Sequence, residues 1–240
     1  MTDETEKALH TLKLPGMANC WSSLNETHQL DKLSLREGLP LLIQTERDMR
    51  RDNGIARLIK NARFRLKASI EELEMDTARG ISAAAVADLA TCEYIKNGMT
   101  VIITGPAGTG KTYLATALGD RACRQGFKVM YFTMNMLVST LKMVRLENHL
   151  NAFFRKLTAQ DLIIIDDWGM QKLQGDIQND IEQLIDDRYN FKSLILCSQL
   201  PVSDWYGIFQ SELIAEACLD RVVHKNVRFS LQGESLRKKY

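Results

Sequence analysis

One octapeptide of the chain combines residue types that bind phosphate, Gly105-Pro106-Ala107-Gly108-Thr109-Gly110-Lys111-Thr112. It matches the pattern G-x-x-x-x-G-K-[ST] at every fixed position. Glycines let the backbone wrap closely around a phosphate with its N–H groups pointing inward, and the positive end of the following helix adds to the attraction. The lysine suits the β- and γ-phosphates, and the threonine hydroxyl suits Mg²⁺. We therefore expect nucleotide binding by Gly105, Pro106, Ala107, Gly108, Thr109, Gly110, Lys111, Thr112 and Tyr113.

Two adjacent aspartates, Asp166 and Asp167, follow the apolar run Leu162–Ile165. A short continuous apolar run is typical of a strand buried on both faces of a parallel sheet. Acids in such a place need a positive partner, and the Mg²⁺ shared with nucleotide phosphates is one. The pattern predicts that Asp166 and Thr112 hold Mg²⁺, that Asp167 polarises the attacking water, and that Lys111 is also catalytic. The other interpretation is a strand end whose acids are capped by solvent.

From Met99 onward, strand-like and helix-like segments alternate. Strands are expected at residues 99–104, 129–133, 162–165, 194–197 and 227–231. A helix is expected from Lys111 to Gln125, with Gly126 in the position of a C-cap glycine. Alternation of this kind predicts an α/β fold, in which helices cover both faces of a mostly parallel sheet.

The first hundred residues have helical patterns instead. Ser34-Leu35-Arg36-Glu37 has the form of a capping box, and the helix that it opens is expected to be broken by Asn53-Gly54. Ser69-Ile70-Glu71-Glu72 is expected to open a further short helix in the same manner. The chain is thus expected to consist of a small all-helical domain, residues 1–76, and an α/β domain, residues 77–240.

Residues 55–67 form a basic amphipathic pattern. At 100° per residue, the apolar side chains gather in one arc and Arg57, Lys60, Arg63 and Lys67 gather on the opposite side. Such a face is either the solvated side of a surface helix or a surface that contacts the phosphates of a nucleic acid. The one-signed clustering opposite a continuous apolar stripe makes DNA binding a hypothesis for these four residues.

The bulk properties exclude several classes of protein. The chain has 240 residues and a formal net charge of only +1, so whole-molecule charge predicts no partner. Its five cysteines lack metal-ligand spacing, which argues against zinc and against disulfides. The polar N-terminus is unlike a signal peptide, and no apolar stretch reaches the length of a membrane span. A soluble cytoplasmic protein without a membrane partner is expected.

Residues 105–112 have the pattern of a P-loop, the phosphate-binding loop of many nucleotide-binding proteins. Two further features of the sequence, a missing guanine-reading motif and an additional helical domain, narrow the class of P-loop protein. A GTPase should carry a guanine-reading N-K-x-D motif, and none is found. A small-molecule kinase has no need of a separate basic helical domain. An ATPase that acts on a macromolecule remains.

The chain resembles the IstB family, the ATPase partners of insertion-sequence transposases, and more broadly the DnaC-type branch of the AAA+ proteins. The resemblance runs nearly from end to end. Besides the P-loop and Asp166-Asp167-Trp168-Gly169, it rests on Leu12-Lys13-Leu14-Pro15-Gly16-Met17, Ala62-Arg63-Phe64-Arg65, Cys92-Glu93-Tyr94-Ile95, Ser198-Gln199-Leu200-Pro201-Val202, Leu219-Asp220-Arg221-Val222-Val223-His224 and Gly233-Glu234-Ser235-Leu236-Arg237.

The resemblance implies catalytic roles for three further residues. Gln199 would be the polar sensor beside the γ-phosphate, with Ser198 as its substitute, unless the pair is only a turn cap. Arg221 would be an arginine finger that reaches the nucleotide of the neighbouring subunit, or else a local helix ion pair. Arg237 would be a second sensor that touches phosphate in its own subunit, or else part of a plain basic tail.

The resemblance also places a helical insertion at residues 134–157, as two short helices around Asn148. Basic side chains along it would face DNA or would be ordinary surface residues, and these are Lys142, Arg145, Arg155 and Lys156.

Two features depart from most AAA+ proteins. Asp167 stands where they usually have Glu, although the DnaC-like branch shares this difference. A side chain shorter by one methylene holds the water less well, so slow hydrolysis at subunit interfaces is expected. The chain also ends at Tyr240, which leaves no room for the C-terminal helical lid of many AAA+ proteins.

The expected function is that of an ATP-dependent, DNA-binding regulator of transposition. Subunits with ATP and Mg²⁺ between them would associate head to tail along duplex DNA, through backbone contacts largely without sequence specificity. The assembly would recruit and stimulate a transposase until hydrolysis resets it. The nearest alternative is a DnaC-type replicative helicase loader. A metabolic P-loop kinase and a DNA scaffold that barely hydrolyses ATP are more distant ones.

Overall fold

The computed structural model describes residues 4–236, which belong to two compact units. The first unit ends at Arg57 and the second begins at Leu58, whereas the sequence placed the boundary near residue 76. Residues 58–76 belong to the second unit because apolar side chains from this stretch, such as Leu58 and Leu73, pack against its core.

The first unit is helical in the part that the structure describes. Its elements are α1 (Glu4–Thr11), α2 (Pro15–Glu26), the 3₁₀ helix η1 (Leu30–Lys32) and the first part of α3 (Leu35–Ala62).

A carboxylate of α3 caps the amino end of α2. Glu46 Oε2 accepts hydrogen bonds from the backbone N–H groups of Gly16, at 2.7 Å, and Met17, at 3.2 Å. These are two of the donors that a helix leaves unsatisfied at its start. A Cβ atom on Gly16 would lie 2.6 Å from the Cα of Glu46, so only glycine allows this approach. The contact gives Pro15-Gly16-Met17 a structural role, with proline at the first position of the helix.

Helix α3 confirms one expectation and corrects two others. Glu37 accepts from the backbone N–H of Ser34 at 3.0 Å, as the capping box requires. The helix is not broken at Asn53-Gly54, because one glycine costs only about 1 kcal/mol in helix propensity. It ends at Ala62, and Arg63 takes the left-handed conformation with φ 58°, so the expected helix to residue 67 is wrong. Neither α3 nor any other described helix is long and apolar enough to span a membrane.

The second unit alternates helices and strands after an irregular stretch. Residues 69–76 are not helical, and Ser69 instead accepts from the N–H of Glu72 in a turn. The elements are η2 (Thr77–Arg79), α4 (Ala83–Ala90), α5 (Glu93–Lys96), β1 (Thr100–Thr104), α6 (Lys111–Arg124), β2 (Val129–Thr133), α7 (Met134–Leu146), α8 (Leu150–Thr158), β3 (Leu162–Trp168), α9 (Asp176–Arg188), β4 (Ser193–Ser198), η3 (Val202–Ile208), α10 (Glu212–His224) and β5 (Asn226–Ser230).

The strands of the described chain form one parallel sheet in the order β2-β3-β4-β1-β5. Each strand lies at the position expected from its apolar run. Because all strands run in the same direction, their carboxyl ends meet at one edge of the sheet. Strand β4 lies between β1 and β3, so the residue that follows it is placed between the P-loop and the paired aspartates.

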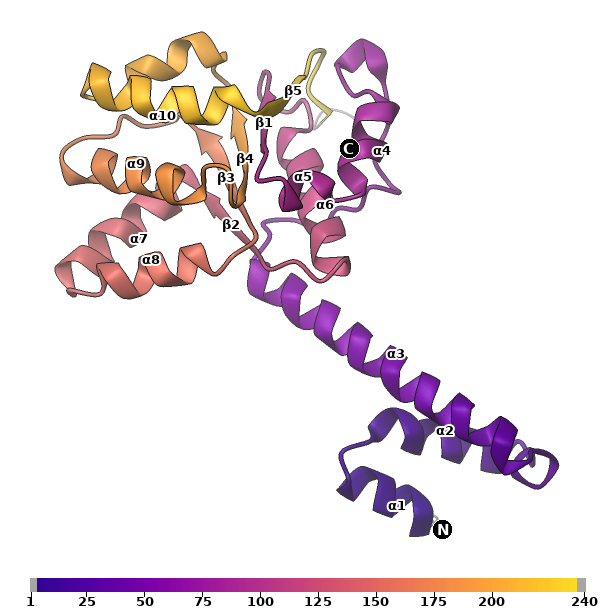
Figure 1. The fold of residues 1–240 in the computed structure, drawn as a ribbon. Helices are drawn as coiled ribbons and strands as arrows, with labels where there is room; N and C mark the ends of the chain where they lie inside the picture. Colours follow the sequence, from indigo (N-terminus) through magenta and orange to yellow (C-terminus); the bar gives the residue numbers. More distant parts are fainter. Residues whose placement is uncertain (1–3, 237–240) are drawn as a thin grey trace. The chain divides into compact units, whose positions relative to one another are not determined.

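Helices cover both faces of this sheet (Figure 1). On one face, α4, α5, α6 and residues that follow α3 pack around Val101, Ile103 and Ile164. On the other face, α7, α8, α9, η3 and α10 pack around Ile163, Ile165 and Leu196. This arrangement confirms the α/β fold expected from the sequence, and it confirms the two short helices on either side of Asn148.

A buried arginine connects several segments at the edge of the sheet where the strands begin, called here the amino edge. Arg188, at the end of α9, is 1% exposed. Its guanidinium donates to four backbone carbonyls, which belong to Leu157, Gln160, Asp161 and Ser193. These carbonyls lie at the end of α8 and at the starts of β3 and β4, so one side chain replaces the water that they would otherwise need.

We predict that Arg188→Met lowers the free energy of unfolding by about 3 kcal/mol or more, because methionine keeps the packing of the stem but leaves buried acceptors without donors. Denaturant unfolding of the full chain measures this. The exposed Arg228 of β5 provides the control, since Arg228→Met should change stability by about 0.5 kcal/mol or less. Equal effects of the two variants would contradict the assigned role.

Candidate nucleotide-binding site

The P-loop connects strand β1 to the amino end of α6. Gly105, Gly108 and Gly110 all have positive φ values, 148°, 82° and 100°. A Cβ atom on Gly108 would lie 2.1 Å from Ser235 Oγ, so glycine is required there by the neighbouring chain as well as by the turn. The loop begins against β4, where the N–H of Gly105 donates to the carbonyl of Ser198 at 3.2 Å.

Lys111 is the first residue of α6, and its side chain folds back over the loop. The Nζ atom donates to the carbonyls of Gly105 and Pro106, both at 2.7 Å, and the residue is 7% exposed. The ammonium group and the positive end of α6 therefore lie at the same place. Together they form a cradle for an anion.

The carboxylate of Asp166 brings the two sequence motifs together. Its Oδ2 accepts from Thr112 Oγ1 at 2.7 Å, and its Oδ1 accepts from the backbone N–H of Asp167 at 2.9 Å. A hydroxyl and a carboxylate oxygen side by side suit Mg²⁺, which takes one or two protein oxygens and completes its shell with phosphates and water. The residues expected to hold Mg²⁺ thus fit it in type and in position.

Tyr131 is a third partner of this carboxylate, and the sequence gave no reason to single it out. Its hydroxyl donates to Asp166 Oδ2 at 2.8 Å, and the residue is 2% exposed. Burial and the neighbouring Asp166 carboxylate raise the pKa of the Tyr131 phenol, so it remains a donor at physiological pH. The only signal was a polar tip in the otherwise apolar strand β2, and its use depends on the pairing of β2 with β3.

Asp167 lies in a distortion of β3. The pairing with β4 shifts between Ile165 and Trp168, and Asp167 has a φ of 57°. A bulge of this kind turns a side chain in a new direction. The carboxylate is 36% exposed, and Oδ2 lies 3.7 Å from Nη1 of Arg65.

The two residues at the end of β4 have different surroundings. Ser198 is fully buried, and its hydroxyl donates to the carbonyl of Trp168 at 2.7 Å and accepts from the N–H of Leu200 at 3.0 Å. It is the turn cap that was one interpretation of the pair. Gln199 is exposed and follows the strand that lies between β1 and β3. Its expected role as a sensor beside the γ-phosphate stays a prediction.

The segment after β5 lies against the P-loop. The N–H of Leu236 donates to the carbonyl of Gly108 at 2.9 Å, and Arg79 donates to the carbonyl of Glu234 at 2.9 Å. Arg237 follows directly but lies outside the described residues, so its expected contact with phosphate stays a prediction. Tyr113, the last residue expected to bind nucleotide, donates from its hydroxyl to Glu72 at 3.2 Å.

Arg221 of α10 is at the opposite edge of the sheet. It lines a small hollow together with Thr100 and Leu194, which belong to the amino ends of β1 and β4. Its Nε atom lies 2.8 Å from Asp186 Oδ1 of α9. The ion pair thus joins two helices instead of forming within one. Because the P-loop follows the carboxyl end of β1, Arg221 does not share an edge with the P-loop of its own chain.

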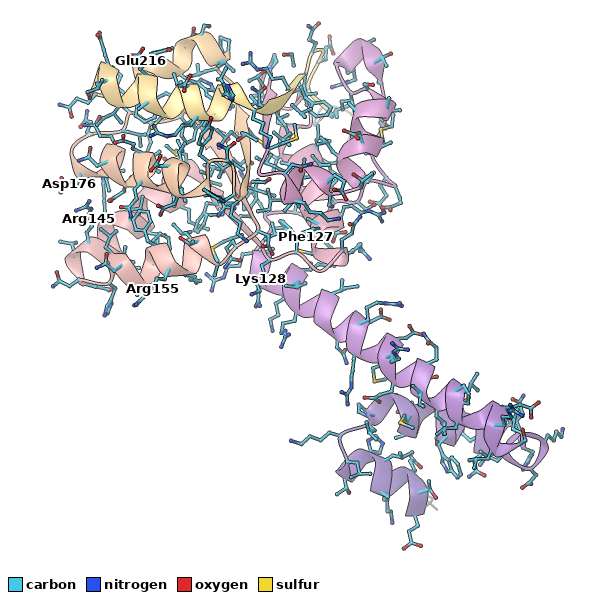
Figure 2. All side chains as sticks on the ribbon, viewed as in Figure 1. Phe127, Lys128, Arg145, Arg155, Asp176 and Glu216 are labelled. Atoms are coloured by element: carbon cyan, nitrogen blue, oxygen red, sulfur yellow. The ribbon has the colours of Figure 1, made fainter. Side chains whose placement is uncertain are left out.

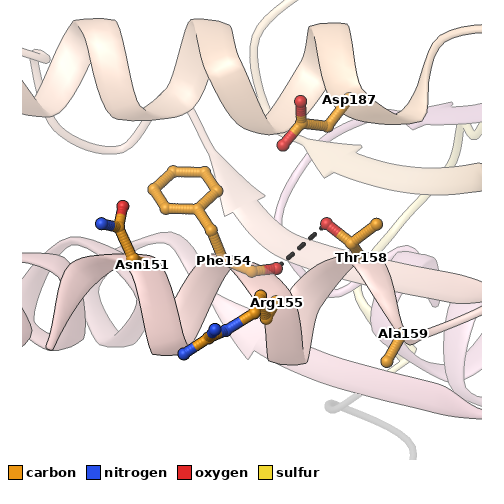
Figure 3. A pocket seen from close by; sticks show the side chains of 6 residues that line it. All are labelled: Asn151, Phe154, Arg155, Thr158, Ala159 and Asp187. Atoms are coloured by element: carbon orange, nitrogen blue, oxygen red, sulfur yellow. Dashed lines mark hydrogen bonds between the residues drawn. The ribbon is translucent and has the colours of Figure 1, made fainter.

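The basic residues of the helical insertion are in two different situations. Arg145 forms two hydrogen bonds with Asp180, at 2.6 and 2.7 Å, and lies beside Asp176 of α9 (Figure 2). Its guanidinium is therefore used to hold α7 against α9. Lys142, Arg155 and Lys156 are exposed. Figure 3 shows Arg155 directed away from Asp187, at the shallow hollow between α8 and α9.

Arg57, Lys60, Arg63 and Lys67 are all exposed. Since α3 ends at Ala62, Arg63 and Lys67 are not on a helical face as expected but in the turn and the extended segment that follow it.

The sequence profile of the family described as IstB-like ATP binding protein matches residues 7–240. The chain is 36% identical over 230 residues to the insertion sequence ATP-binding protein y4pL of Sinorhizobium fredii, which covers 96% of this chain and 94% of that protein. It is 30% identical over 236 residues to the insertion sequence IS21 ATP-binding protein of Pseudomonas aeruginosa, with 98% and 89% covered.

Two solved structures have the same fold. AMPPCP-bound DnaA from Aquifex aeolicus matches with a TM-score of 0.61 at 19% identity, over 73% of this chain and 53% of that one. The DnaC helicase loader matches with a TM-score of 0.57 at 19% identity, over 72% of this chain and 98% of that one. The parallel sheet with its P-loop is thus the AAA+ type of α/β fold.

We predict that Tyr131→Phe lowers the free energy of unfolding by about 1.5–3 kcal/mol, the range for a hydrogen bond to a charged group. Most of this loss should vanish when Asp166→Asn is already present, because the partner of the phenol is then no longer charged. A double-mutant cycle followed by denaturant unfolding measures the coupling. Equal losses in both backgrounds would mean that the Tyr131 hydroxyl contributes independently of the charge on Asp166.

Proposed function

Because the chain belongs to the family of IstB-like ATP-binding proteins, we propose that it is a transposition-associated ATPase that assembles on duplex DNA and recruits a transposase. The observation that carries the proposal is the contact between Thr112 of the P-loop and Asp166 of β3. It supports a joint nucleotide and magnesium site, in a family whose relatives include ATP-binding proteins of insertion sequences.

ATP is the nucleotide that the site would take. The P-loop N–H groups, the amino end of α6 and Lys111 supply positive charge for the phosphates. Thr112 and Asp166 would hold Mg²⁺, which would supply positive charge against the charge that develops on the phosphates.

Hydrolysis would begin with a water that Asp167 orients toward the γ-phosphorus. The water oxygen forms a bond to phosphorus while the bond to the β–γ bridging oxygen breaks, and the products are ADP and inorganic phosphate. Gln199 would hydrogen-bond the γ-phosphate during this transfer. The short reach of an aspartate predicts slow turnover, which suits a timing step.

Assembly would join opposite edges of neighbouring subunits. The nucleotide site lies at the carboxyl edge of the sheet and Arg221 lies at the amino edge, so Arg221 would complete the site of the next subunit. An interface between two different surfaces is head-to-tail and produces rings or helical filaments. ATP at each interface then makes assembly depend on nucleotide.

DNA would bind through its phosphates. The exposed residues Lys60, Arg63, Lys67, Lys142, Arg155 and Lys156, together with Arg57 at the end of the first unit, are the candidates. Arg145 is a weaker candidate because Asp180 and Asp176 occupy its guanidinium. Contacts of this kind are largely independent of base sequence and strongly dependent on salt.

We predict that particles much larger than a monomer form only when ATP and duplex DNA are both present. Particle mass in solution, with ATP, ADP or no nucleotide and with duplex or single-stranded DNA, measures this. Lys111→Ala should abolish the large particles because ATP is no longer held, and Arg221→Ala should abolish them because the interface is incomplete.

A matched control separates the finger role of Arg221 from its ion pair. Asp186→Asn removes the same ion pair but keeps the guanidinium, so it should leave assembly intact. Loss of assembly in both variants would show that the ion pair is structural. Assembly on single-stranded DNA alone would instead favour a DnaC-type helicase loader. A chain that stays monomeric with every DNA would contradict both the transposition role and the helicase-loader role.

We further predict that Lys60→Ala weakens duplex binding and lowers the slope of log affinity against log salt concentration by about 0.9, the value for one lost phosphate contact. Titrations of labelled duplex at several salt concentrations measure the slope. Arg228→Ala, at an exposed position of β5, is the control and should leave the slope unchanged. An unchanged slope in Lys60→Ala would remove Lys60 from the DNA surface.

A further inference from the structure

The short segment Arg63–Arg65 contacts one acid of the candidate site directly and is linked to the other through Tyr131. Phe64 lies edge-on to the ring of Tyr131, with centroids 6.5 Å apart, and Tyr131 donates to Asp166. The next residue, Arg65, lies 3.7 Å from the carboxylate of Asp167. Two neighbouring side chains just beyond the end of α3, Phe64 and Arg65, are therefore linked to the two acids of the candidate site.

Phe64 fixes the position of this segment. Its ring lies so close to α6 that a Cβ atom on Gly119 would be 2.8 Å from Phe64 Cε1. Gly119 thus leaves room for the phenylalanine between α6 and the sheet. Since Phe64 is anchored there, the stem of Arg65 starts within reach of Asp167, and the ion pair does not depend on chance positioning of a long side chain.

The ion pair itself is weak and accessible. The side chain of Arg65 is 58% exposed and that of Asp167 is 36% exposed. Pairs of this kind contribute little to stability and are easily exchanged for other partners. Arg65 therefore has no large structural role to explain its place beside a candidate catalytic acid.

Arg65 is also within the run of exposed basic residues. Arg63 and Lys67 are two positions away on either side, and both are exposed. A phosphate group that binds to them arrives next to Arg65. The guanidinium binds phosphate with two parallel hydrogen bonds, at least as well as it binds a carboxylate.

We propose that the Arg65–Asp167 ion pair is a latch that restrains the water-orienting acid, and that a DNA phosphate opens it by taking Arg65. Without DNA, Asp167 is held toward Arg65 and hydrolysis is slow. With DNA, Asp167 turns to the water and hydrolysis accelerates. This inference rests on the proposed function of the chain as a DNA-dependent ATPase, and it makes Arg65 a positioning residue that acts through Asp167.

The test compares ATP turnover by the full chain with Arg65→Ala, Arg65→Lys and the wild type, each without and with duplex DNA. Arg65→Ala should raise the DNA-free kcat roughly two- to five-fold, the factor that an exposed ion pair can contribute. The KM for ATP should stay unchanged, and DNA should no longer stimulate. Arg65→Lys keeps a charge and should retain part of the restraint and part of the stimulation.

Arg51→Ala is the matched control, because Arg51 is 65% exposed and forms a comparable ion pair with Asp48 at 3.1 Å. It should leave the DNA-free turnover unchanged. A DNA-free kcat in Arg65→Ala that equals or falls below the wild-type value would overturn the latch. A raised KM would overturn it too, since Arg65 would then touch the nucleotide.

Failure of the proposed function can be told apart from failure of the latch. Duplex binding by each variant is measured separately with labelled DNA. A wild-type chain that does not bind duplex would defeat the DNA function, while the comparison of DNA-free turnover would still decide whether Arg65 restrains Asp167.

Discussion

The carboxylate of Asp166 is the constraint on which the nucleotide site depends. It is 1% exposed, and a buried charge is tolerated only when it is paired or fully hydrogen-bonded. Its partners come from α6, β2 and its own backbone, through Thr112, Tyr131 and the N–H of Asp167. Satisfying one acid thus fixes the start of α6 relative to β2 and β3, which is the geometry that a magnesium site requires.

Because of the strand order, the two opposite edges of the sheet in the second unit carry different groups of functional candidates. Because β4 is inserted between β1 and β3, the P-loop, Gln199 and the two aspartates lie at one edge of the sheet. The amino edge is held together by Arg188, close to Arg221 in the same hollow. A subunit with its acids and P-loop at one edge and its candidate finger at the other is suited to head-to-tail assembly more than to a symmetric dimer.

Features with local causes could be predicted from the sequence. The strands and the P-loop follow from apolar runs and glycine spacing within a few positions, whereas the helix pair around Asn148 was expected from the family resemblance. The continuation of α3 through Asn53-Gly54 could not be predicted in this way. A glycine weakens a helix without necessarily ending it, and the outcome depends on the rest of the helix.

Contacts between segments that are distant in the chain were the part of the site that could not be predicted from the sequence. Tyr131 and Asp166 are 35 positions apart, and Arg65 and Asp167 are much farther apart still. The same holds for Arg145, whose pairing with Asp180 depends on how α7 packs on α9. In each case the residue type was compatible with several partners, and only the fold selected one.

The two neighbouring acids illustrate how one strand end can serve two physical requirements. The Asp166 side chain is buried and accepts three hydrogen bonds, and hydrogen bonds to a charge in such surroundings are strong enough to hold a candidate metal ligand in a single orientation. The partner of Asp167 is exposed, at a distance and in surroundings where a pair contributes little and exchanges easily. The bulge in β3 gives the two acids these different surroundings, because it turns the Asp167 side chain in another direction from the buried side chain of Asp166. A site that binds Mg²⁺ together with its nucleotide and changes its hydrolysis rate when DNA binds, as we propose here, would use this combination of one rigid and one adjustable carboxylate.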